Sequence, residues 1–330
     1  MSKKINILIT GAGGAAAISF FRSLKESHNI YMADMDKYSS GLYFVPANMR
    51  VLIPAGKSHN FINRLLEVCV QRKIQILVPT VDWELLPIAN HIEQFNNMGI
   101  QVISSDKDAI KNCLDKLCLM EHLSKNFQLA PFKKYDQRFN MQDLIYPVLA
   151  KPRCESGSRG IKIISSKSDF HGVPDNGAYL IQEYLPGKEF SVDVYLNKEH
   201  KILASVVRER IKIYSGIAVI SQTLDYPFLS LEAARMTASL KLRYAVNVQF
   251  KLNQLGHPCL LEINPRFPGT MPLTVAAGVN MPQMSIDEIL GKSLQGYYPA
   301  QQMAMVRSWQ EDFLSIDAFN ELNSSDHHDA

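Results

Sequence analysis

The sequence has little cysteine, and the cysteines it has follow no pattern. Five of them are scattered over 330 residues, with no Cys-x-x-Cys pair among them. The odd number and irregular spacing argue against a disulfide framework, and the missing pair argues against a common type of zinc site. A reducing cytoplasm is therefore the setting that we expect for this chain.

Long apolar runs and a strong net charge are also missing. No run of about 18 apolar residues occurs, so we expect no membrane span. The apolar start loosely mimics a signal peptide, but removing it would delete the first strand of an α/β unit. The net charge of +3 is too small to indicate a nucleic-acid partner.

The apolar runs that are present predict a parallel sheet in the first part of the chain. Strand-like runs rich in branched residues alternate there with helical patterns, which is typical of strands joined by crossover helices. We therefore expect residues 1–108 to form a Rossmann-like α/β domain. The predicted elements are strands 5–9, 30–33, 74–79 and 101–104, with helices 15–27 and 60–72 between them.

The pattern changes after this domain, and a chain of this length suits about two or three packed units. One long helix is predicted over 106–123, and strands dominate from there on. The polar stretch from Asp317 to the end is expected to fray. The later predicted elements are strands 146–151, 161–164 and 178–184, a strand meander over 190–224, a helix over 231–242, and a hairpin of 246–252 with 259–263.

A glycine cluster at the start of the chain has two interpretations. Gly11 to Gly14 follow a strand and open a helix, where the backbone can approach an anionic ligand. Asp34 ends the second strand, where a ribose-binding acid would lie in a dinucleotide fold, so an NAD-dependent oxidoreductase is a rival hypothesis. Alternatively, Gly13 lines the site of another substrate, or the turn is structural. Asp82 and Glu84 follow a strand end, and they could hold an amine or cap a helix.

The strongest chemical signal lies in the predicted C-terminal hairpin. Side chains alternate along a strand, so Glu262 and Asn264 share one face, and Arg266 follows beyond a proline. A turn centred between Leu255 and Gly256 would place Gln249 opposite Glu262. Amide and carboxylate oxygens suit Mg²⁺, and arginine suits phosphate oxygens. The pattern predicts a metal site, with a solvated strand face as the alternative.

Two weaker motifs precede this hairpin. Lys151 ends an apolar strand before a Ser/Gly loop at 155–160, whose N–H groups could meet phosphate oxygens. The loop is not a Walker A motif, because no Gly-Lys-Ser/Thr sequence closes it. The apolar strand 181–185 then runs into a turn, where its edge could meet an adenine and Glu189 could meet a ribose.

Taken together and in this order, the motifs resemble those of the ATP-grasp superfamily, and most closely the synthetase halves of the carbamoyl-phosphate synthase large chain. The resemblance covers about residues 1–295. This chain has one such half, whereas that large chain carries two, and its loop is less glycine-rich than is usual in that family and contains Arg159. The motifs are Asp115-Lys116, Ala150-Lys151-Pro152 with its Ser/Gly loop, Gln182 to Glu189, Asn247 to Phe250, and Glu262 to Arg266.

The resemblance implies a fold and a set of roles. The fold is a Rossmann-like domain followed by a two-lobed ATP-grasp unit, α/β and α+β in class. Lys116 and Lys151 would contact ATP phosphates, and Arg266, with Lys151, would be catalytic. The metal, Mg²⁺ or Mn²⁺, would be held by Gln249, Glu262 and Asn264. The other nucleotide-binding residues would be Ser156, Gly157, Ser158 and Gly160 in a lid, Gln182, Glu183 and Leu185 at the adenine, Glu189 at the ribose, and Gln249.

The activity that follows is a ligase that uses Mg·ATP to activate a carboxylate as an acyl phosphate for attack by an amine. A non-catalytic ATP-binding protein is a further alternative, and a homodimer is the usual prior for oligomeric state. The predicted units are 1–108, a small lobe 109–185, a large lobe 186–300 and an extension 301–330. The tentative substrate residues are Gly13, Asp82, Glu84, Arg208, Arg210 and Gly216.

Overall fold

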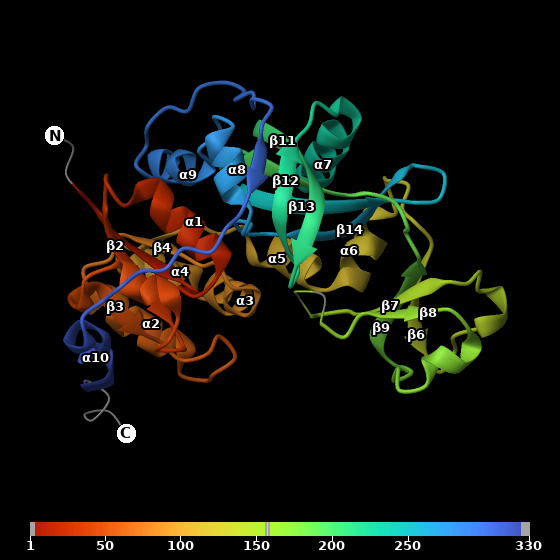
Figure 1. Cartoon of the computed structure of the whole chain (residues 1–330), viewed down its shortest axis with the longest axis horizontal. Helices are drawn as coiled ribbons and strands as arrows, with labels where there is room; N and C mark the ends of the chain where they lie inside the picture. Colours follow the sequence, from red (N-terminus) through yellow and green to blue (C-terminus); the bar gives the residue numbers. More distant parts are fainter. Residues whose placement is uncertain (1–3, 156, 158, 325–330) are drawn as a thin grey trace.

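A computed structural model describes residues 4–155, 157 and 159–324. Three sheets follow one another along its long axis (Figure 1). The first domain forms one end, a four-stranded sheet forms the other, and a six-stranded sheet lies between them. Within the described residues, every helix is too short or too polar to span a bilayer.

The first domain is a parallel sheet with strand order β3-β2-β1-β4-β5. Its central strand buries Ile7, Leu8 and Ile9 completely, as a strand covered on both faces must. The predicted Rossmann-like domain is confirmed. Its elements are β1 Asn6–Thr10, α1 Ala15–Leu24, β2 Asn29–Asp34, β3 Arg50–Leu52, α2 Phe61–Gln71, β4 Ile76–Val78, α3 Asp82–Asn90, α4 Ile92–Asn97 and β5 Gln101–Val102.

The prediction of a single helix over 106–123 is wrong, because the helix is interrupted at Asp115. Helix α5 (Lys107–Leu114) ends there, and α6 (Lys116–Leu123) begins. Asp115 has an extended backbone, and its carboxylate accepts hydrogen bonds from the N–H groups of Leu117 and Cys118. The residue thus acts as an N-cap, which competes with helix continuation.

The two antiparallel sheets that follow form the rest of the molecule. The small sheet has the order β6-β9-β7-β8, and the large sheet has the order β14-β13-β10-β11-β12-β15. The small sheet consists of β6 Phe132–Asp136, β7 Val148–Pro152, β8 Lys162–Ile164 and β9 Asn176–Glu183. The large sheet and its helices are β10 Glu189–Leu196, β11 Ile202–Tyr214, β12 Ile217–Thr223, α7 Pro227–Ser239, β13 Tyr244–Leu252, β14 Pro258–Asn264, α8 Met271–Ala276, α9 Met281–Ile289 and β15 Ala304–Val306.

The large sheet has one apolar face and one polar face, because side chains alternate along its strands. Phe190, Val192 and Val248 pack on the apolar face in one buried cluster with residues of α6 and α7. The cross-strand register places the chemistry-bearing residues on the opposite face. This polar face consists of Glu189, Ser191, Asp193, Arg208, Arg210, Ser221, Thr223, Asn247, Gln249, Glu262 and Asn264.

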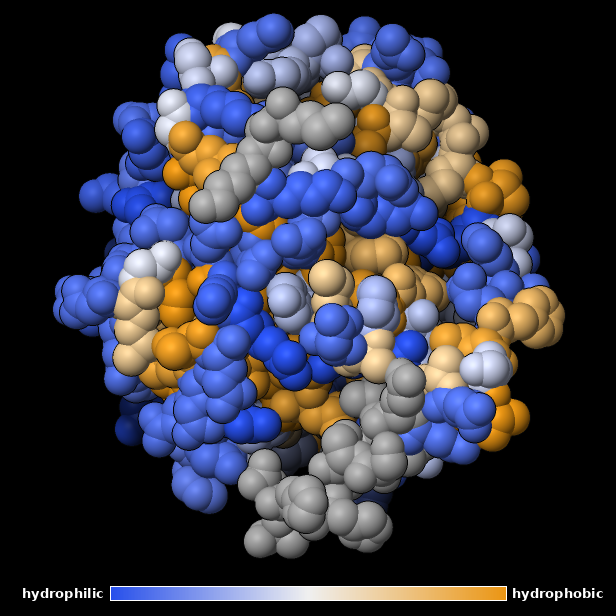
Figure 2. Space-filling model, turned by 90° about the vertical axis from the view of Figure 1, so that its left-hand side faces the viewer, coloured by the Kyte–Doolittle hydropathy of each residue, from blue (hydrophilic) through white to orange (hydrophobic). Residues whose placement is uncertain are grey.

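The prediction that the chain frays from Asp317 is wrong for residues 317–324, which form part of a helix beside the first domain, while residues 325–330 lie outside the described residues. Helix α10 (Ile316–Ser324) lies beside that domain (Figure 1). Phe319 stacks on Tyr43 with ring centroids 5.3 Å apart, and Arg50 donates a hydrogen bond of 2.7 Å to the carbonyl of Ala318. This end of the molecule has small apolar patches among polar residues (Figure 2). A stacked aromatic pair and a buried arginine therefore hold a segment whose composition alone predicts disorder.

Asp193 is the central residue of the polar face. Its carboxylate is completely buried and accepts hydrogen bonds from Arg208, from Asn247 at 2.8 Å and from Thr274. These partners lie on β11, β13 and α8. A buried carboxylate needs a partner of opposite charge and further donors, and Asp193 has both.

Replacing this carboxylate should destabilise the fold strongly. Asp193→Ala leaves the guanidinium of Arg208 buried without a counterion, so we expect the free energy of unfolding to fall by about 3–5 kcal/mol. Asp175 is exposed, and Asp175→Ala should change it by less than about 0.5 kcal/mol. Urea unfolding followed by circular dichroism measures both values, and an equal effect of the two variants would contradict this account.

Candidate active site

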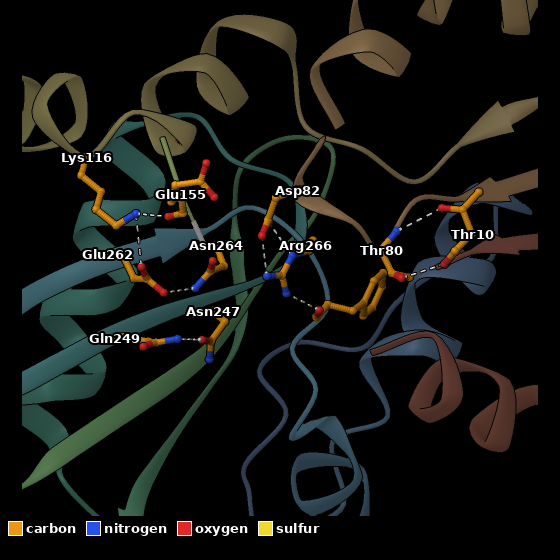
Figure 3. A network of polar contacts seen from close by, with 11 residues as sticks. Thr10, Thr80, Asp82, Lys116, Glu155, Asn247, Gln249, Glu262, Asn264 and Arg266 are labelled. Carbon is orange, nitrogen blue, oxygen red and sulfur yellow. Dashed lines mark hydrogen bonds and ion pairs between the residues drawn. The ribbon is translucent and has the colours of Figure 1, made fainter. Parts of the chain in front are cut away.

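The hairpin of β13 and β14 brings the predicted metal ligands together. Gln249 pairs with Glu262, and Asn247 pairs with Asn264, so the expected register is confirmed. The amide of Asn264 donates a hydrogen bond of 3.1 Å to Glu262 Oε1 (Figure 3). Gln249 Nε2 donates a hydrogen bond of 3.3 Å to Asn247 Oδ1. One carboxylate and several amide oxygens therefore lie on one surface.

Lys116 reaches this surface from the start of α6. Its Nζ lies 3.8 Å from Glu262 Oε2 and also donates a hydrogen bond to the carbonyl of Glu155 (Figure 3). The break in the helix explains this position, since Asp115 is clamped by Arg153 with contacts of 3.0 and 2.6 Å. The N–H of Lys116 in turn donates to the carbonyl of Arg153. The clamp thus fixes Lys116 relative to β7, the strand that carries Lys151.

Lys151 is almost completely buried, with 3% of its surface exposed. Burial lowers the pKa of this lysine to about 8, while Glu262 opposes the shift and Lys116 adds to it. Glu189 also acts on Lys151 as an attractive charge. Lys151 thus interacts electrostatically with both the predicted ribose acid, Glu189, and the predicted metal ligand, Glu262, and its burial favours an additional negative charge.

The predicted adenine and ribose residues lie along β9 and the start of β10. The side-chain carbonyl of Gln182 is buried and has no partner in the described part of the chain, while its amide donates to the carbonyl of Leu260. The N–H of Glu183 already donates to the carbonyl of Pro131. Leu185 is buried. An amino group at this place would satisfy the orphan oxygen of Gln182.

Glu189 forms an ion pair of 2.7 Å with Arg210. Arg210 also donates a hydrogen bond of 2.8 Å to the carbonyl of Gly216, at the tip of the β11–β12 hairpin. The structure thus places Arg210 beside the predicted ribose acid, and its predicted substrate contact stays a prediction. Gly216 faces the lid: a Cβ atom there would lie 3.5 Å from the Cα of Gly157.

The lid loop has the backbone that its glycines predict. Gly157 and Gly160 adopt positive φ angles of 67° and 71°, which other residues rarely adopt. Ser156 and Ser158, which are predicted to bind the nucleotide, lie outside the described residues. The contact of Gly157 with Gly216 brings the loop over the polar face.

Arg266 lies at the junction of the two main units. Its guanidinium makes two contacts with Asp82, of 2.6 and 2.9 Å, and donates to the carbonyl of Phe267 (Figure 3). Asp82 is the first residue of α3 in the first domain. In the structure Asp82 pairs with Arg266 and does not cap α3, whose N-cap residue is Val81, and its predicted role as an amine ligand stays a prediction.

The other candidates of the first domain lie at the carboxyl edge of its sheet. Glu84 is buried and accepts a hydrogen bond from Thr10, and burial raises its pKa to about 7. Asp34 accepts a hydrogen bond of 2.8 Å from the N–H of Gly13. This bond uses the predicted ribose acid to hold the glycine loop itself, which weakens the NAD-dependent interpretation.

Two structural supports of the site were not predicted from the sequence. Arg153 forms an ion pair with Asp115. Asp193 accepts hydrogen bonds from Arg208 and Asn247 on the two neighbouring strands. The alternation of polar residues along 189–193 could have indicated a polar sheet face, but no local signal identifies the distant partners of either residue.

The family described as ATP-grasp in the biosynthetic pathway with Ter operon matches residues 175–312. The PylC-like N-terminal domain family matches residues 7–103. Together the two matches cover both the first domain and the large sheet.

Solved structures with the same fold share little sequence with this chain. A biotin carboxylase complex from Campylobacter jejuni has a TM-score of 0.72 at 15% identity, covering 89% of this chain and 72% of that one. N5-carboxyaminoimidazole synthetase from Staphylococcus aureus, complexed with ADP, has a TM-score of 0.73 at 16% identity, with coverages of 92% and 82%. A biotin carboxylase domain dimer from Hydrogenobacter thermophilus, complexed with MgADP, ADP and bicarbonate, has a TM-score of 0.70 at 15% identity, with coverages of 89% and 72%.

The solved structures establish the fold, and the family match over residues 175–312 indicates an ATP-grasp family. The predicted order of a Rossmann-like domain followed by two antiparallel units is confirmed. The motif-based recognition is confirmed for ATP-grasp, since residues 175–312 match a family model of that kind.

Proposed function

We propose that the protein is a ligase that uses Mg·ATP to join a carboxylic acid to an amine. The observation that carries this proposal is the meeting of Glu262, Lys116 and Lys151 on one polar surface, with Gln249 and Asn264 beside them. Phosphoryl transfer depends mainly on positioning and on neutralising negative charge, and these residue types supply both.

The residues fit a Mg²⁺ ion that phosphate oxygens help to hold. No group of three or more His, Cys, Asp and Glu side chains in the described part of the chain could hold a metal alone. Mg²⁺ is commonly bound by one or two carboxylates together with substrate phosphates. Glu262 supplies the carboxylate, and Asn264 and Gln249 supply amide oxygens. When bound, the ion would neutralise charge on the phosphates.

Further contacts support the binding of an adenine nucleotide. The unpaired carbonyl of Gln182 would accept a hydrogen bond from the adenine amino group, and Glu189 would accept one from a ribose hydroxyl. Lys116 and Lys151 would then bind phosphate oxygens, and Lys116 would give up its contact with the carbonyl of Glu155. Gly157, which lies close to Gly216 at the tip of the β11–β12 hairpin, would lie over the phosphates.

The proposed reaction has two steps. A carboxylate oxygen of the acid attacks the γ-phosphorus, and the bond to the bridging oxygen breaks to release ADP. The amine nitrogen then attacks the acyl carbon of the acyl phosphate and loses a proton, and inorganic phosphate leaves. Arg266, beside Glu262, would steady the transferred phosphoryl group. To contact the phosphoryl group, Arg266 would have to give up part of its contact with Asp82.

ADP release from the purified protein tests the proposal. Mg·ATP is supplied with a matrix of carboxylic acids and amines, amino acids first. ADP formation that requires one acid and one amine supports the ligase. ATP binding by calorimetry with no turnover across the matrix would favour a non-catalytic ATP-binding protein. Tight NAD binding without ATP binding would favour the oxidoreductase.

Removing the charge of Glu262 should stop turnover and leave the fold intact. In Glu262→Gln the shape is kept but the anionic metal ligand is lost, so ADP formation should fall by about 1,000-fold or more, since a metal contributes several kcal/mol to the transition state. Glu121 is exposed on α6, and Glu121→Gln serves as the control, with unchanged turnover. Retained turnover in Glu262→Gln, with both variants folded by circular dichroism, would contradict the metal assignment.

The lowered pKa of Lys151 predicts a pH-dependent affinity for Mg·ATP. Phosphate binds the protonated lysine, and the unbound site loses that proton as the pH rises through about 8. The dissociation constant should therefore rise by about tenfold for each pH unit above that value. Lys151→Arg keeps its charge and should remove this dependence.

Calorimetry at a series of pH values measures this effect. The exposed Lys125 provides the matched control, since Lys125→Arg should bind Mg·ATP with the same pH profile as the original protein. A profile for Lys151→Arg that is as steep as that of the control would refute the assignment of Lys151 to the phosphates.

A further inference from the structure

A pocket of about 680 Å³ lies where the first domain meets helices α5 and α6. Its walls are formed by the segment from Gly56 to the start of α2, by α3, by α5, by the start of α6, and by Cys154 beyond the end of β7. Pockets of this size commonly bind small molecules. The pocket therefore has room for a ligand group in addition to the nucleotide, which we place on the polar face of the large sheet.

The lining of this pocket is predominantly apolar. Nζ of Lys57 lies 3.3 Å from the centroid of the Trp83 ring, so the indole and this cation share one wall. An apolar lining with few polar groups favours an apolar ligand group, because binding removes apolar surface from water. The apolar lining residues are Phe61, Ile62, Trp83, Leu86, Pro87 and Leu114.

The pocket adjoins the proposed reaction centre on two sides. Asp82 lines the pocket and also makes both contacts with Arg266. Figure 3 shows this pair next to the hairpin of β13 and β14. On another wall, Cys154 directly precedes Glu155, whose carbonyl accepts a hydrogen bond from Lys116. A molecule bound in the pocket would thus extend towards the place where we propose phosphoryl transfer.

The charges on the pocket walls favour an acid over an amine. The carboxylates of the lining residues Asp82 and Asp115 each form an ion pair with an arginine. The lining residues Lys57 and Lys111 are exposed, and none of the ion pairs between described residues involves either of them. The charge that remains without a counterion is therefore positive, and it attracts an anion and repels an ammonium group.

We propose that this pocket binds an apolar, ring-sized substituent of the acid substrate, so that the enzyme activates aromatic or branched apolar carboxylic acids. This inference rests on the proposed ligase activity and narrows its substrate class. The substituent lies against Trp83 and Leu114, and the carboxylate lies at the Asp82 end of the pocket, beside Arg266. A small acid would leave the apolar lining in contact with water and would bind more weakly.

Tryptophan fluorescence tests this directly, because the chain has only two tryptophans. Trp309 is 87% exposed and does not line the pocket. Trp309→Phe therefore leaves Trp83 as the reporter, and Trp83→Phe leaves Trp309 as the matched control. The probe is para-nitrophenylpropionic acid, whose ring quenches tryptophan. It should quench Trp83 with saturation, whereas Trp309 should show only the weak, linear quenching that collisions cause.

An amine with the same ring tests the preference for an acid. In the variant that keeps Trp83, para-nitrophenethylamine should bind about tenfold or more weakly than the acid, because the lysines repel it. Lys111→Gln should reduce this preference. Lys107→Gln removes an exposed charge four residues earlier on α5, outside the pocket, and should leave the preference unchanged.

Two results would overturn the inference: quenching of Trp83 that saturates no more than that of Trp309, and equal affinity for the acid and the amine. The titration needs no nucleotide, so it does not depend on ATP binding. Where ADP release is found, phenylpropionic acid should have a KM about tenfold or more below that of propionic acid. Trp83→Ala should remove much of this difference.

The same measurements separate this inference from the proposed function. ADP release with propionic acid but not with phenylpropionic acid overturns the inference and leaves the ligase standing. Saturable quenching of Trp83 without ADP release for any acid contradicts the ligase, while the preference of the pocket for an apolar acid stands.

Discussion

The buried carboxylate of Asp193 is the interaction on which the site depends. It joins β10 to β11, β13 and α8 through Arg208, Asn247 and Thr274. The residues of the proposed nucleotide site come next along the same strands and lie on the same face of the sheet. Gln249 lies two residues beyond Asn247, and Arg210 lies two residues beyond Arg208. A buried charge permits few alternative pairings, so this network fixes the register of the chemically important residues.

A second ion pair places the first domain on this sheet. Arg266 follows β14, and its two contacts with Asp82 fix the start of α3 against the hairpin of β13 and β14. The glycine loop of the first domain lies near the same junction, because Gly269 packs against Ala15. The two units thus share one polar region. The glycine loop, held by Asp34, borders this region and is not arranged as an independent dinucleotide site.

The sequence was most informative where the relevant contacts are local. The pairing of Gln249 with Glu262 could be predicted from the alternation of side chains about an assumed turn, although a β-bulge between Gln249 and Phe250, which the sequence did not reveal, brings the two residues opposite each other. The break at Asp115 could not, because an arginine 38 residues further along the chain clamps that carboxylate. Helix α10 was missed for a similar reason, since Arg50 and Tyr43 of the first domain hold it.

The balance of charge on the polar region explains how the site is suited to anionic ligands. Among the described residues, the cations on or beside this face include Lys116, Lys151, Arg208, Arg210, Lys251 and Arg266, and the carboxylates include Asp82, Glu189, Asp193 and Glu262.

Burial lowers the pKa of Lys151, and the neighbouring cation Lys116 lowers it further, so cations in this partly buried region are unfavourable until negative charge arrives. The repulsion between these cations is offset within the folded protein, largely through Asp193. The cations are therefore already in place when the ligand binds. Such prearranged charge favours anionic ligands and the transfer of a phosphoryl group between them. The chain as a whole carries a net charge of only +3, so the selectivity for anions comes from where the cations are placed and not from their total number.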